Sequence, residues 1–547
     1  MSFRKDIQER LEEAVSKAGY GGEGVRVVLE KPRHKEHGDM ATPVALSLAR
    51  EFKKNPMQIA EEVAGELSFP AGTVAAVEVA RPGYINLTLS QEMLTGNLEE
   101  VHRTGDRYGE SDCGRGTKCQ VEYVSANPTG PLVLVSARAA AIGSVIVNLL
   151  RAAGFDAEGE YYVNDSGNQV RALGESLRFR VRERLGRKEG GEIGAYPGDY
   201  LKDIAATVEP DEAARWDADP AGVARYGAFA TDALLREIER DLERFGVRFD
   251  NFFRESSLHP DAVDEARGIV EKQGYAYVED GALYFRTSEF GDEKDRVLVK
   301  SDGNATYFLG DIAYHLTKLR RGHRWALDLL GPDHHGHIPR MLAAAKVLGA
   351  AEGWLNVLIV GWVRLLEGGK PVSMSKRAGD IITMRELIED VGKDVAKFFF
   401  LMRRANTPLD FDLDLARKQS DENPVYYVQY AHARIASVAR FAEQKGLKLP
   451  ERVEDCHKLE SPQERELMVH LLFFPHVVEA AALTREPHRV ATYAQELAAL
   501  FHRFYHAHRV VTDSEEVSAG RFFLVDAARQ VLRNALCVMG VDAPESM

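Results

Sequence analysis

Three clusters of polar residues each follow an apolar segment that we predict to be a β-strand. They occupy residues 127–136, 331–337 and 373–379, and read NPTGPLVLVS, GPDHHGH and SMSKRAG. Ligands bind at the carboxyl ends of the strands in a parallel sheet, so we expect the three clusters to converge on one site. Lys376 lies in the third cluster near several glycines, which suits a mobile arm that carries a cation to a polyphosphate.

The second cluster is dense in histidine. His334, His335 and His337 stand beside Asp333 and offer many hydrogen-bond donors and acceptors at the end of one strand. A metal site is the competing interpretation. It is disfavoured because the three histidines lie close together in one loop, without cysteine and without the second spaced pair of ligands of a closed zinc site. We therefore predict a substrate-binding cluster and no metal held by the protein.

The first cluster lies in a segment, residues 121–150, that predicts a strand, a tight turn and a helix. The turn is rich in proline and glycine, and the apolar residues after it fall on one helical stripe, Ile142, Val145, Ile146, Leu149 and Leu150. The start of such a helix presents unpaired N–H groups that favour anionic oxygens. An ordinary strand-helix unit has the same pattern, so other parts of the chain must decide.

Three further strand-helix segments follow, at residues 306–322, 324–349 and 355–380. Each has an apolar stretch that we predict to be a strand, followed by a polar cluster or a helix. This alternation predicts a parallel, doubly wound sheet. A long insertion separates its two halves and contains a helix over residues 223–245 and a hairpin over residues 281–303.

The chain has 547 residues and is expected to contain several domains. Residues 1–110 predict a separate α/β module. Its expected elements are a first helix, a strand at 25–29, helices at 41–52 and 56–67, and strands at 74–80 and 84–90. From residue 423 onward the pattern predicts a bundle of long helices at 426–444, 465–483, 488–511 and 520–540.

The net charge of −14 excludes a surface that is basic throughout, so a nucleic acid must be bound by local patches. Residues 169–188 form a basic face, and the basic loop at residues 31–37 either grips phosphates or is simply solvated. The four cysteines are mostly far apart, which favours a reducing cytoplasm. The first helix is amphipathic, unlike a signal peptide, and no apolar run has the length of a membrane span.

Five motifs occur in order along the chain: SANPTGPL, YFLGDIAYH, GPDHHGH, MSKRAG and DENPVYYVQYAHAR. Together they closely resemble the class I arginyl-tRNA synthetases. HGDMATPVALSLAR and RPGYINLTLS resemble that family's additional tRNA-binding domain, and the tail ending in MGVDAPESM resembles its anticodon-binding bundle. The resemblance implies that ATP and L-arginine form arginyl-adenylate and pyrophosphate, with Mg²⁺ accompanying ATP. The arginyl group then passes to the terminal ribose of tRNA(Arg).

Pattern and resemblance together predict a multidomain α/β chain built around a Rossmann-like parallel sheet. The expected parts are an N-terminal tRNA-binding domain over 1–110, a catalytic domain over 111–380 with an insertion at about 170–295, a connecting segment over 381–420 and a helical anticodon-binding domain over 421–547. We expect a cytoplasmic monomer with no membrane partner.

The resemblance also implies the site residues. Those expected to bind arginine are Glu122, Asn127, Tyr307, Asp311 and His335. The two acids agree with the chemistry, because a planar guanidinium is best met by carboxylates. The competing structural interpretation is that the first acid caps a strand and the tyrosine packs in a core. Residues expected at ATP are Ser125, Pro128, Thr129, Gly130, Val133, Val135, Ser136, Asp333, His334 and Lys376. The expected catalytic residues are Ser136, Ser375 and Lys376.

The chain departs from the family pattern at residues 133–136, where members typically carry His-x-Gly-His and this chain has Val-Leu-Val-Ser. Ser373 also replaces the first lysine of the lysine loop. Losing one preorganised donor to a transition-state charge commonly costs about a hundred- to a thousandfold in rate.

These departures leave two main hypotheses: an active synthetase with a degenerate signature, or a catalytically impaired relative that binds tRNA or arginine. The retained acids and Lys376 favour the first. A different nucleotidyl-transferring enzyme on the same sheet would leave both outer domains unexplained.

Overall fold

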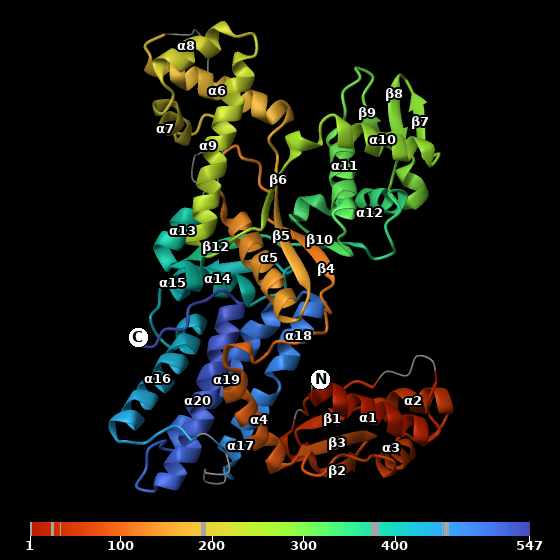
Figure 1. Ribbon diagram of the computed structural model, residues 1–547, viewed down its shortest axis with the longest axis vertical. Coiled ribbons are helices and arrows are strands. Elements are labelled where there is room, and N and C mark those ends of the chain that lie inside the picture. Colours follow the sequence, from red (N-terminus) through yellow and green to blue (C-terminus); the bar gives the residue numbers. More distant parts are fainter. Residues whose placement is uncertain are drawn as a thin grey trace.

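The computed structural model describes residues 3–22, 27–32, 34–187, 193–372, 382–450, 452 and 459–547. Figure 1 shows an elongated molecule with the parallel sheet near its middle. The helical C-terminal part lies below the sheet, the N-terminal domain extends sideways at the bottom, and two lobes rise above. This arrangement confirms the predicted multidomain α/β architecture.

The N-terminal domain packs a three-stranded antiparallel sheet, of order β1-β3-β2, against helices. Its elements are α1 (Phe3–Lys17), β1 (Met40–Thr42), α2 (Val44–Phe52), α3 (Pro56–Gly65), β2 (Val74–Ala80) and β3 (Tyr84–Leu89), followed by α4 (Gln91–Thr104). Local sequence explains the start of α3: Pro56 occupies its first turn, and the Asn55 side chain accepts from Met57 N at 2.9 Å.

Two predictions for this domain are wrong. No strand forms over residues 27–29, the described part of the segment predicted as a strand, and only Glu30 makes a β-bridge there. The helix predicted at 41–52 starts later, because Met40–Thr42 pairs with β3 as a strand. The second difference follows from pairing with a distant strand, which a local pattern does not contain.

The central sheet has five parallel strands in the order β11-β10-β4-β5-β6. They are β4 (Lys118–Glu122), β5 (Asp156–Val163), β6 (Asn251–Arg254), β10 (Trp325–Leu330) and β11 (Leu355–Ile359). The chain adds β5 and β6 on one side of β4 and then β10 and β11 on the other, so the sheet is doubly wound as predicted. One face packs on α5 (Leu134–Ala152), and the other on α11 (Tyr307–Arg320) and α12 (Ile338–Val347).

One predicted strand of this sheet is a helix. The sequence predicts a strand at the start of residues 306–322, but α11 occupies this segment and buries apolar side chains every three or four residues. The prediction is wrong. It arose because the residues TYFL at the start of the segment favour strands. The helix brings Tyr307, Asp311 and Lys318 onto one face, since these positions repeat at about the helical period.

Strand β6 divides the predicted insertion into two lobes. The first contains α6 (Gly167–Arg184), α7 (Tyr200–Ala206), α8 (Pro210–Ala218) and α9 (Gly222–Arg244). The second contains α10 (Asp261–Lys272) and the antiparallel strands β7 (Ala276–Glu279), β8 (Ala282–Phe285) and β9 (Arg296–Val299). The predicted hairpin is thus confirmed, with a third strand added to it.

Basic residues on α6 and just after it hold the first lobe together. Arg178, Arg182 and Arg187 each lie within 3.3 Å of the Asp217 carboxylate on α8. Arg184 donates to two backbone carbonyls at the end of α7. Much of the predicted basic face is therefore engaged in contacts within the protein.

The C-terminal half begins with a small sheet and short helices: β12 (Val363–Glu367), β13 (Lys370–Pro371), α13 (Met384–Val391), α14 (Lys393–Leu401), β14 (Leu409–Asp412) and α15 (Leu413–Ala416). The bundle follows as α16 (Pro424–Gln444), α17 (Pro462–Leu472), α18 (Phe474–Thr484), α19 (His488–Ala507) and α20 (Glu515–Val538). The single helix predicted at 465–483 is two helices, because Pro475 lacks the N–H that a continuous helix needs.

Two segments are long and apolar enough to cross a membrane, namely α5 and Pro462–Thr484, contrary to the expectation that no run has this length. Most of each lies buried inside the protein fold. Both are core helices here, because their apolar faces pack against the sheet and against the other helices of the bundle.

Candidate active site

β4 and β10 lie side by side in the central sheet, and we call the region at their carboxyl ends the crevice. The chain reverses its direction of strand addition between these two strands, and ligands bind at the carboxyl ends of strands at such a point. β4 ends at Glu122, whose register partner in β10 is Asp328. The turn at residues 127–131 follows β4, and the 3₁₀ turn Pro332–His337 follows β10. Two of the three predicted polar clusters therefore meet at this crevice.

A buried charge group lies beneath the crevice. The Lys318 ammonium on α11 donates to Glu122 Oε2 and to Asp328 Oδ1, each at 2.8 Å. The lysine side chain is fully buried, and both acids are buried as well. One ammonium serves two carboxylates, so the group has a net negative charge when both acids are ionised.

The two acids of this group differ in their surroundings. Burial raises the pKa of Glu122, and Lys318 offsets only part of this effect. Burial also opposes ionisation of Asp328, but Lys318 and His315 outweigh it and lower its pKa. His315 Nε2 lies 2.8 Å from Asp328 Oδ2 and contributes to this difference. The acid without a full counter-charge is therefore Glu122, at the end of β4.

The loop after β4 has an unusual backbone. Val124 and Ser125 have φ angles of 69° and 37°, in the left-handed region that a β-branched residue rarely adopts. This conformation lets Ser125 Oγ donate to Glu122 Oε1 at 2.9 Å and accept from Tyr162 N at 3.1 Å. The Ser125 hydroxyl, which we expected at ATP, thus orients Glu122. Backbone strain of this kind costs about 1–3 kcal/mol per residue and is typical of functional sites.

Neighbouring segments hold the turn at residues 127–131. Asn127 Oδ1 accepts from Asn164 Nδ2 at 2.8 Å, and the Thr129 carbonyl accepts from the Tyr200 hydroxyl of α7 at 2.5 Å. The Tyr200 ring lies 3.6 Å from where a Cβ on Gly130 would stand. The first lobe of the insertion therefore contacts the turn directly.

Helix α5 starts at the crevice, with Val133 as its N-cap and with Val135 and Ser136 in its first turn. No side chain caps this end, so first-turn N–H groups remain without a side-chain acceptor. The positive end of a 19-residue helix favours anionic groups at this position. Donors for a phosphate are therefore present although the two histidines of the family pattern are absent.

Arg138, one turn further along α5, is fully buried and fixes this helix start. Its guanidinium donates to the backbone carbonyls of Gly361, Trp362, Arg404 and Thr407. Burial lowers the pKa of Arg138 to about 10, so it remains a cation at neutral pH. Val133 also forms a β-bridge with Thr383. The start of α5 is thereby joined to the segments that flank the lysine loop.

Tyr307 and Asp311 lie one turn apart on the face of α11 that ends at the crevice. Tyr307 is 58% exposed, so it does not pack in a core. Its hydroxyl lies close to Gly167 of α6, since a Cβ at that glycine would stand 3.3 Å away. Asp311 Oδ2 lies 3.1 Å from His337 Nε2. The helix therefore presents an aromatic hydroxyl and a carboxylate together, with the histidine cluster beside them.

The other residues of the 3₁₀ turn face solvent. Asp333, His334 and His335 are all exposed, and their one ionic contact with described residues is the 3.7 Å approach of His334 Nε2 to Asp333 Oδ2. Among the residues that the structure describes, no group of three His, Cys, Asp or Glu side chains is placed to hold a metal. The turn is open to a ligand and does not form a metal cage.

Comparison with known proteins decides the family. Residues 5–89 match the arginyl tRNA synthetase N terminal domain, and residues 100–399 match the catalytic domain of the class I (R) tRNA synthetases. The chain belongs to the class I arginyl-tRNA synthetases. Residues 428–547 match the DALR anticodon binding domain, in agreement with the resemblance of the tail.

Curated relatives match over nearly the full length. The arginine–tRNA ligase of Syntrophotalea carbinolica is 47% identical over 526 residues, which cover 95% of this chain and 94% of the relative. The arginine–tRNA ligase of Geobacillus kaustophilus is 44% identical over 551 residues, which cover 100% of this chain and 99% of the relative. Among solved structures, Thermus thermophilus arginyl-tRNA synthetase has a TM-score of 0.77 at 23% identity and covers 100% of both chains, which shows the shared fold.

Within this synthetase fold, the structure brings most of the predicted residues to one crevice. Ser373, Ser375 and Lys376 lie outside the described residues. The sequence did not predict the inner partners, which are Tyr162, His315, Lys318 and Asp328. The signal for Lys318 was its helical spacing from Asp311, which becomes visible only when residues 307–320 are assigned to a helix.

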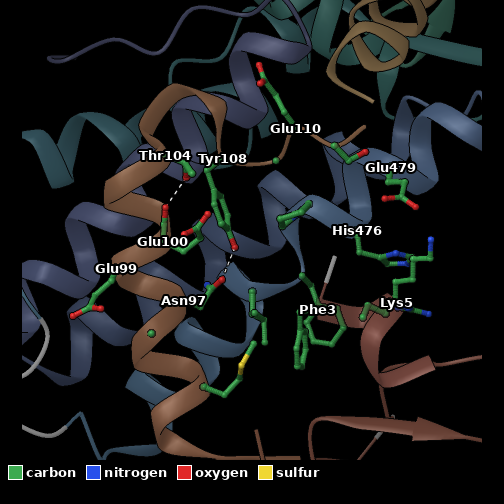
Figure 2. Close-up of a pocket in the computed structure, with 18 of the residues that line it drawn as sticks. Phe3, Lys5, Asn97, Glu99, Glu100, Thr104, Tyr108, Glu110, His476 and Glu479 are labelled. Atoms are coloured by element: carbon green, nitrogen blue, oxygen red, sulfur yellow. Dashed lines mark hydrogen bonds between the residues drawn. The ribbon is translucent and has the colours of Figure 1, made fainter. Parts of the chain in front are cut away.

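A hollow of about 1460 Å³ lies away from the crevice, between α1, α4 and the α17–α18 pair (Figure 2). Figure 2 shows four acidic side chains around it, those of Glu99, Glu100, Glu110 and Glu479. Tyr108 on its wall donates to Asn97 Oδ1 at 2.9 Å and to the Leu471 carbonyl at 3.0 Å, which ties α4 to α17. Acids outnumber bases along the lining, so this domain joint does not suit phosphate or RNA.

Proposed function

We propose that this chain attaches L-arginine to tRNA(Arg) and that the β4–β10 crevice activates the amino acid with ATP. The observation that carries the proposal is the buried charge group whose unbalanced acid, Glu122, lies at the crevice. A cationic substrate supplies the missing positive charge. Relatives named as arginine–tRNA ligases match this chain over nearly its full length.

The arginine side chain is proposed to lie between the end of β4 and α11. Glu122 and Asp311 supply carboxylates for the guanidinium, whose five N–H donors lie in one plane. The Tyr307 hydroxyl and Asn127, both at the rim of the crevice, add polar contacts. His335 in the exposed turn is the remaining proposed contact.

ATP is proposed to lie over the start of α5, with its phosphates at the uncapped N–H groups. Val133, Val135 and Ser136 line this helix start, and the turn residues Pro128, Thr129 and Gly130 approach the adenosine side. Asp333 and His334, which are exposed in the turn after β10, are proposed to contact ATP from the other side. Ser375 and Lys376 are the proposed contacts of the lysine loop, and Mg²⁺ is proposed to enter with ATP as part of the substrate.

Activation is an in-line displacement. A carboxylate oxygen of arginine forms a bond to the α-phosphorus, the bond from that phosphorus to the β-phosphate bridge breaks, and pyrophosphate leaves. In the second step a hydroxyl of the terminal tRNA ribose attacks the carbonyl carbon of arginyl-adenylate, and AMP leaves. The protein contributes positioning and charge stabilisation: the helix N-terminus faces the phosphates, and Glu122 with Asp311 holds the amino acid.

The tRNA is proposed to contact the C-terminal bundle through α16 and α19. Arg434 lies 5.0 Å from the ring centre of Tyr430 and 4.9 Å from that of Tyr505. A hollow of about 480 Å³ beside them is also lined by Arg440 and Phe441. Aromatic rings and guanidinium planes of this kind stack unpaired bases, which suits an anticodon loop. We further propose that the chain acts in the cytoplasm as a monomer.

Pyrophosphate exchange with ATP, arginine and tRNA(Arg) all present tests the proposal, and we expect measurable exchange. A flat signal together with tight tRNA binding would instead support a catalytically impaired relative.

Asp311→Asn should raise the arginine KM about tenfold to a hundredfold, because a neutral amide cannot pair with the guanidinium. The ATP KM should change little. Asp390→Asn is the matched control, because Asp390 lies on α13 and pairs with Arg417. This variant should leave both KM values unchanged.

A further inference from the structure

Two tyrosine hydroxyls donate to the backbone around the turn at residues 127–131. Tyr161, on β5 of the central sheet, donates to the Ala126 carbonyl at 2.7 Å. Tyr200, at the start of α7, donates to the Thr129 carbonyl at 2.5 Å. The first contact comes from the sheet on which the turn is built, whereas the second comes from the first lobe of the insertion. This lobe therefore holds the part of the turn that is proposed to approach ATP.

The contact with Tyr200 fixes one peptide group of the turn. The peptide bond between Thr129 and Gly130 is trans, so its C=O and N–H point in opposite directions. Because the carbonyl faces Tyr200, the Gly130 N–H faces the other side of the turn. Within the described part of the chain, no group accepts a hydrogen bond from this N–H. It is a donor open to a ligand, and its direction depends on Tyr200.

The first lobe places the Tyr200 ring independently of the turn. Arg180 on α6 donates to the Pro197 carbonyl at 3.0 Å and so fixes the segment before α7. Gly198 leaves room for the ring, because a Cβ at this residue would stand only 2.3 Å from it. Leu201, the residue after the tyrosine, is fully buried in the core of the lobe. The hydroxyl is therefore held in position by the packing of the lobe.

We propose that Tyr200 is a positioning residue for ATP, because its bond to the Thr129 carbonyl directs the Gly130 N–H toward the nucleotide. This inference rests on the ATP site proposed above. The oxygens of ATP are acceptors, and this N–H adds a donor to those at the start of α5. Without the hydroxyl the peptide group can rotate, and the N–H must be reoriented whenever ATP binds. Burial raises the pKa of Tyr200 to about 12, so the hydroxyl remains a donor at neutral pH.

Tyr200→Phe in the full-length enzyme tests this inference, because phenylalanine keeps the ring and removes only the hydroxyl. In pyrophosphate exchange the ATP KM should rise about three- to tenfold, the effect of losing one hydrogen bond, and the arginine KM should stay unchanged. Tyr226→Phe is the matched control. The Tyr226 hydroxyl contacts the Ala213 carbonyl at 3.3 Å inside the same lobe, so its loss should leave both KM values unchanged.

Gly198→Ala supplies a second test that leaves the hydroxyl in place. The added Cβ displaces the Tyr200 ring, so the ATP KM should rise at least as much as in Tyr200→Phe, again with an unchanged arginine KM. Because both changes act through the same hydroxyl, combining them should raise the ATP KM no further than the more severe single variant. An ATP KM raised by the product of the two single effects would overturn the inference.

The outcomes separate this inference from the proposed function. If Asp311→Asn raises the arginine KM but Tyr200→Phe leaves the ATP KM unchanged, the proposed function stands and the role of Tyr200 is overturned. An equal rise of both KM values in Tyr200→Phe, or the same rise of the ATP KM in Tyr226→Phe, also overturns it, because either result reflects a loosened lobe. If the native enzyme shows no exchange, the proposed function itself is wrong. Should Tyr200→Phe fail to fold, the two KM values of Gly198→Ala decide.

Discussion

Replacing Lys318 by methionine tests the buried charge group beneath the crevice. Methionine has nearly the length of the lysine stem, so the ammonium is lost while most of the packing is kept. Glu122 and Asp328, each held at 2.8 Å from the ammonium, would then face each other without a counter-charge. Removing one partner of a buried ion pair costs about 3–5 kcal/mol. We expect a loss of this size in the free energy of unfolding at pH 7.

The loss should shrink on acidification. Without Lys318, the folded-state pKa values of the two carboxyls rise above their unfolded values, so the variant regains stability as pH falls and these groups are protonated. In the native protein the pKa of Asp328 is lowered, so its contribution is lost only in stronger acid. Urea denaturation at pH 7 and at pH 5 measures the difference between the two proteins at each pH. That difference should be smaller at pH 5.

Two further variants make this test decisive. Lys318→Met combined with Asp328→Asn removes the ammonium and one acid, and should recover more than half of the lost stability. Lys397→Met removes another buried lysine, whose partners are the carbonyls of Gly246 and Gly540, and should show no recovery at pH 5. A double variant as unstable as Lys318→Met alone would refute the reasoning, because the loss would then come from packing and not from unbalanced charge.

Two other predictions concern the start of α5. Arg138→Met leaves four backbone carbonyls without their donor and should lower the free energy of unfolding by about 3 kcal/mol or more, measured by urea denaturation. An unchanged denaturation midpoint would contradict its role as the joint between α5 and the chain around the lysine loop. Restoring histidine at Val133 and Ser136 with glycine at Val135 should raise the rate of pyrophosphate exchange by about a hundredfold, the worth of one preorganised donor. No increase would mean that the main-chain N–H groups already supply that stabilisation.

The local sequence pattern was sufficient to predict most of the fold. The strand, turn and helix at residues 121–150 are β4 and α5 with their intervening loop, and the proline and glycine of the turn sit where the chain leaves the sheet. The alternation of strands and helices gave the doubly wound sheet, and helical periodicity gave the C-terminal bundle. These features depend on residues near one another in the sequence, so a period of two or of 3.6 reveals them.

Two of the errors share one physical cause. The start of residues 306–322 was predicted to be a strand because its aromatic and branched side chains favour strands, but packing against the central sheet selects the helix. Met40–Thr42 is a strand because β3 lies beside it. Tertiary contact overrides local preference at such positions, because the contact energy exceeds the small difference in propensity.

The sequence by itself determined the family and the order of the domains, because these depend on motifs that can be read in order along the chain. Only the tertiary structure decided how Glu122 is paired and why it lacks a full counter-charge. Lys318 and Asp328 come from segments far from β4 in the sequence, and their effect on Glu122 depends on burial and distance, which no spacing encodes. Charges interact strongly where folding removes water from between them, so their roles appear only when the chain is folded.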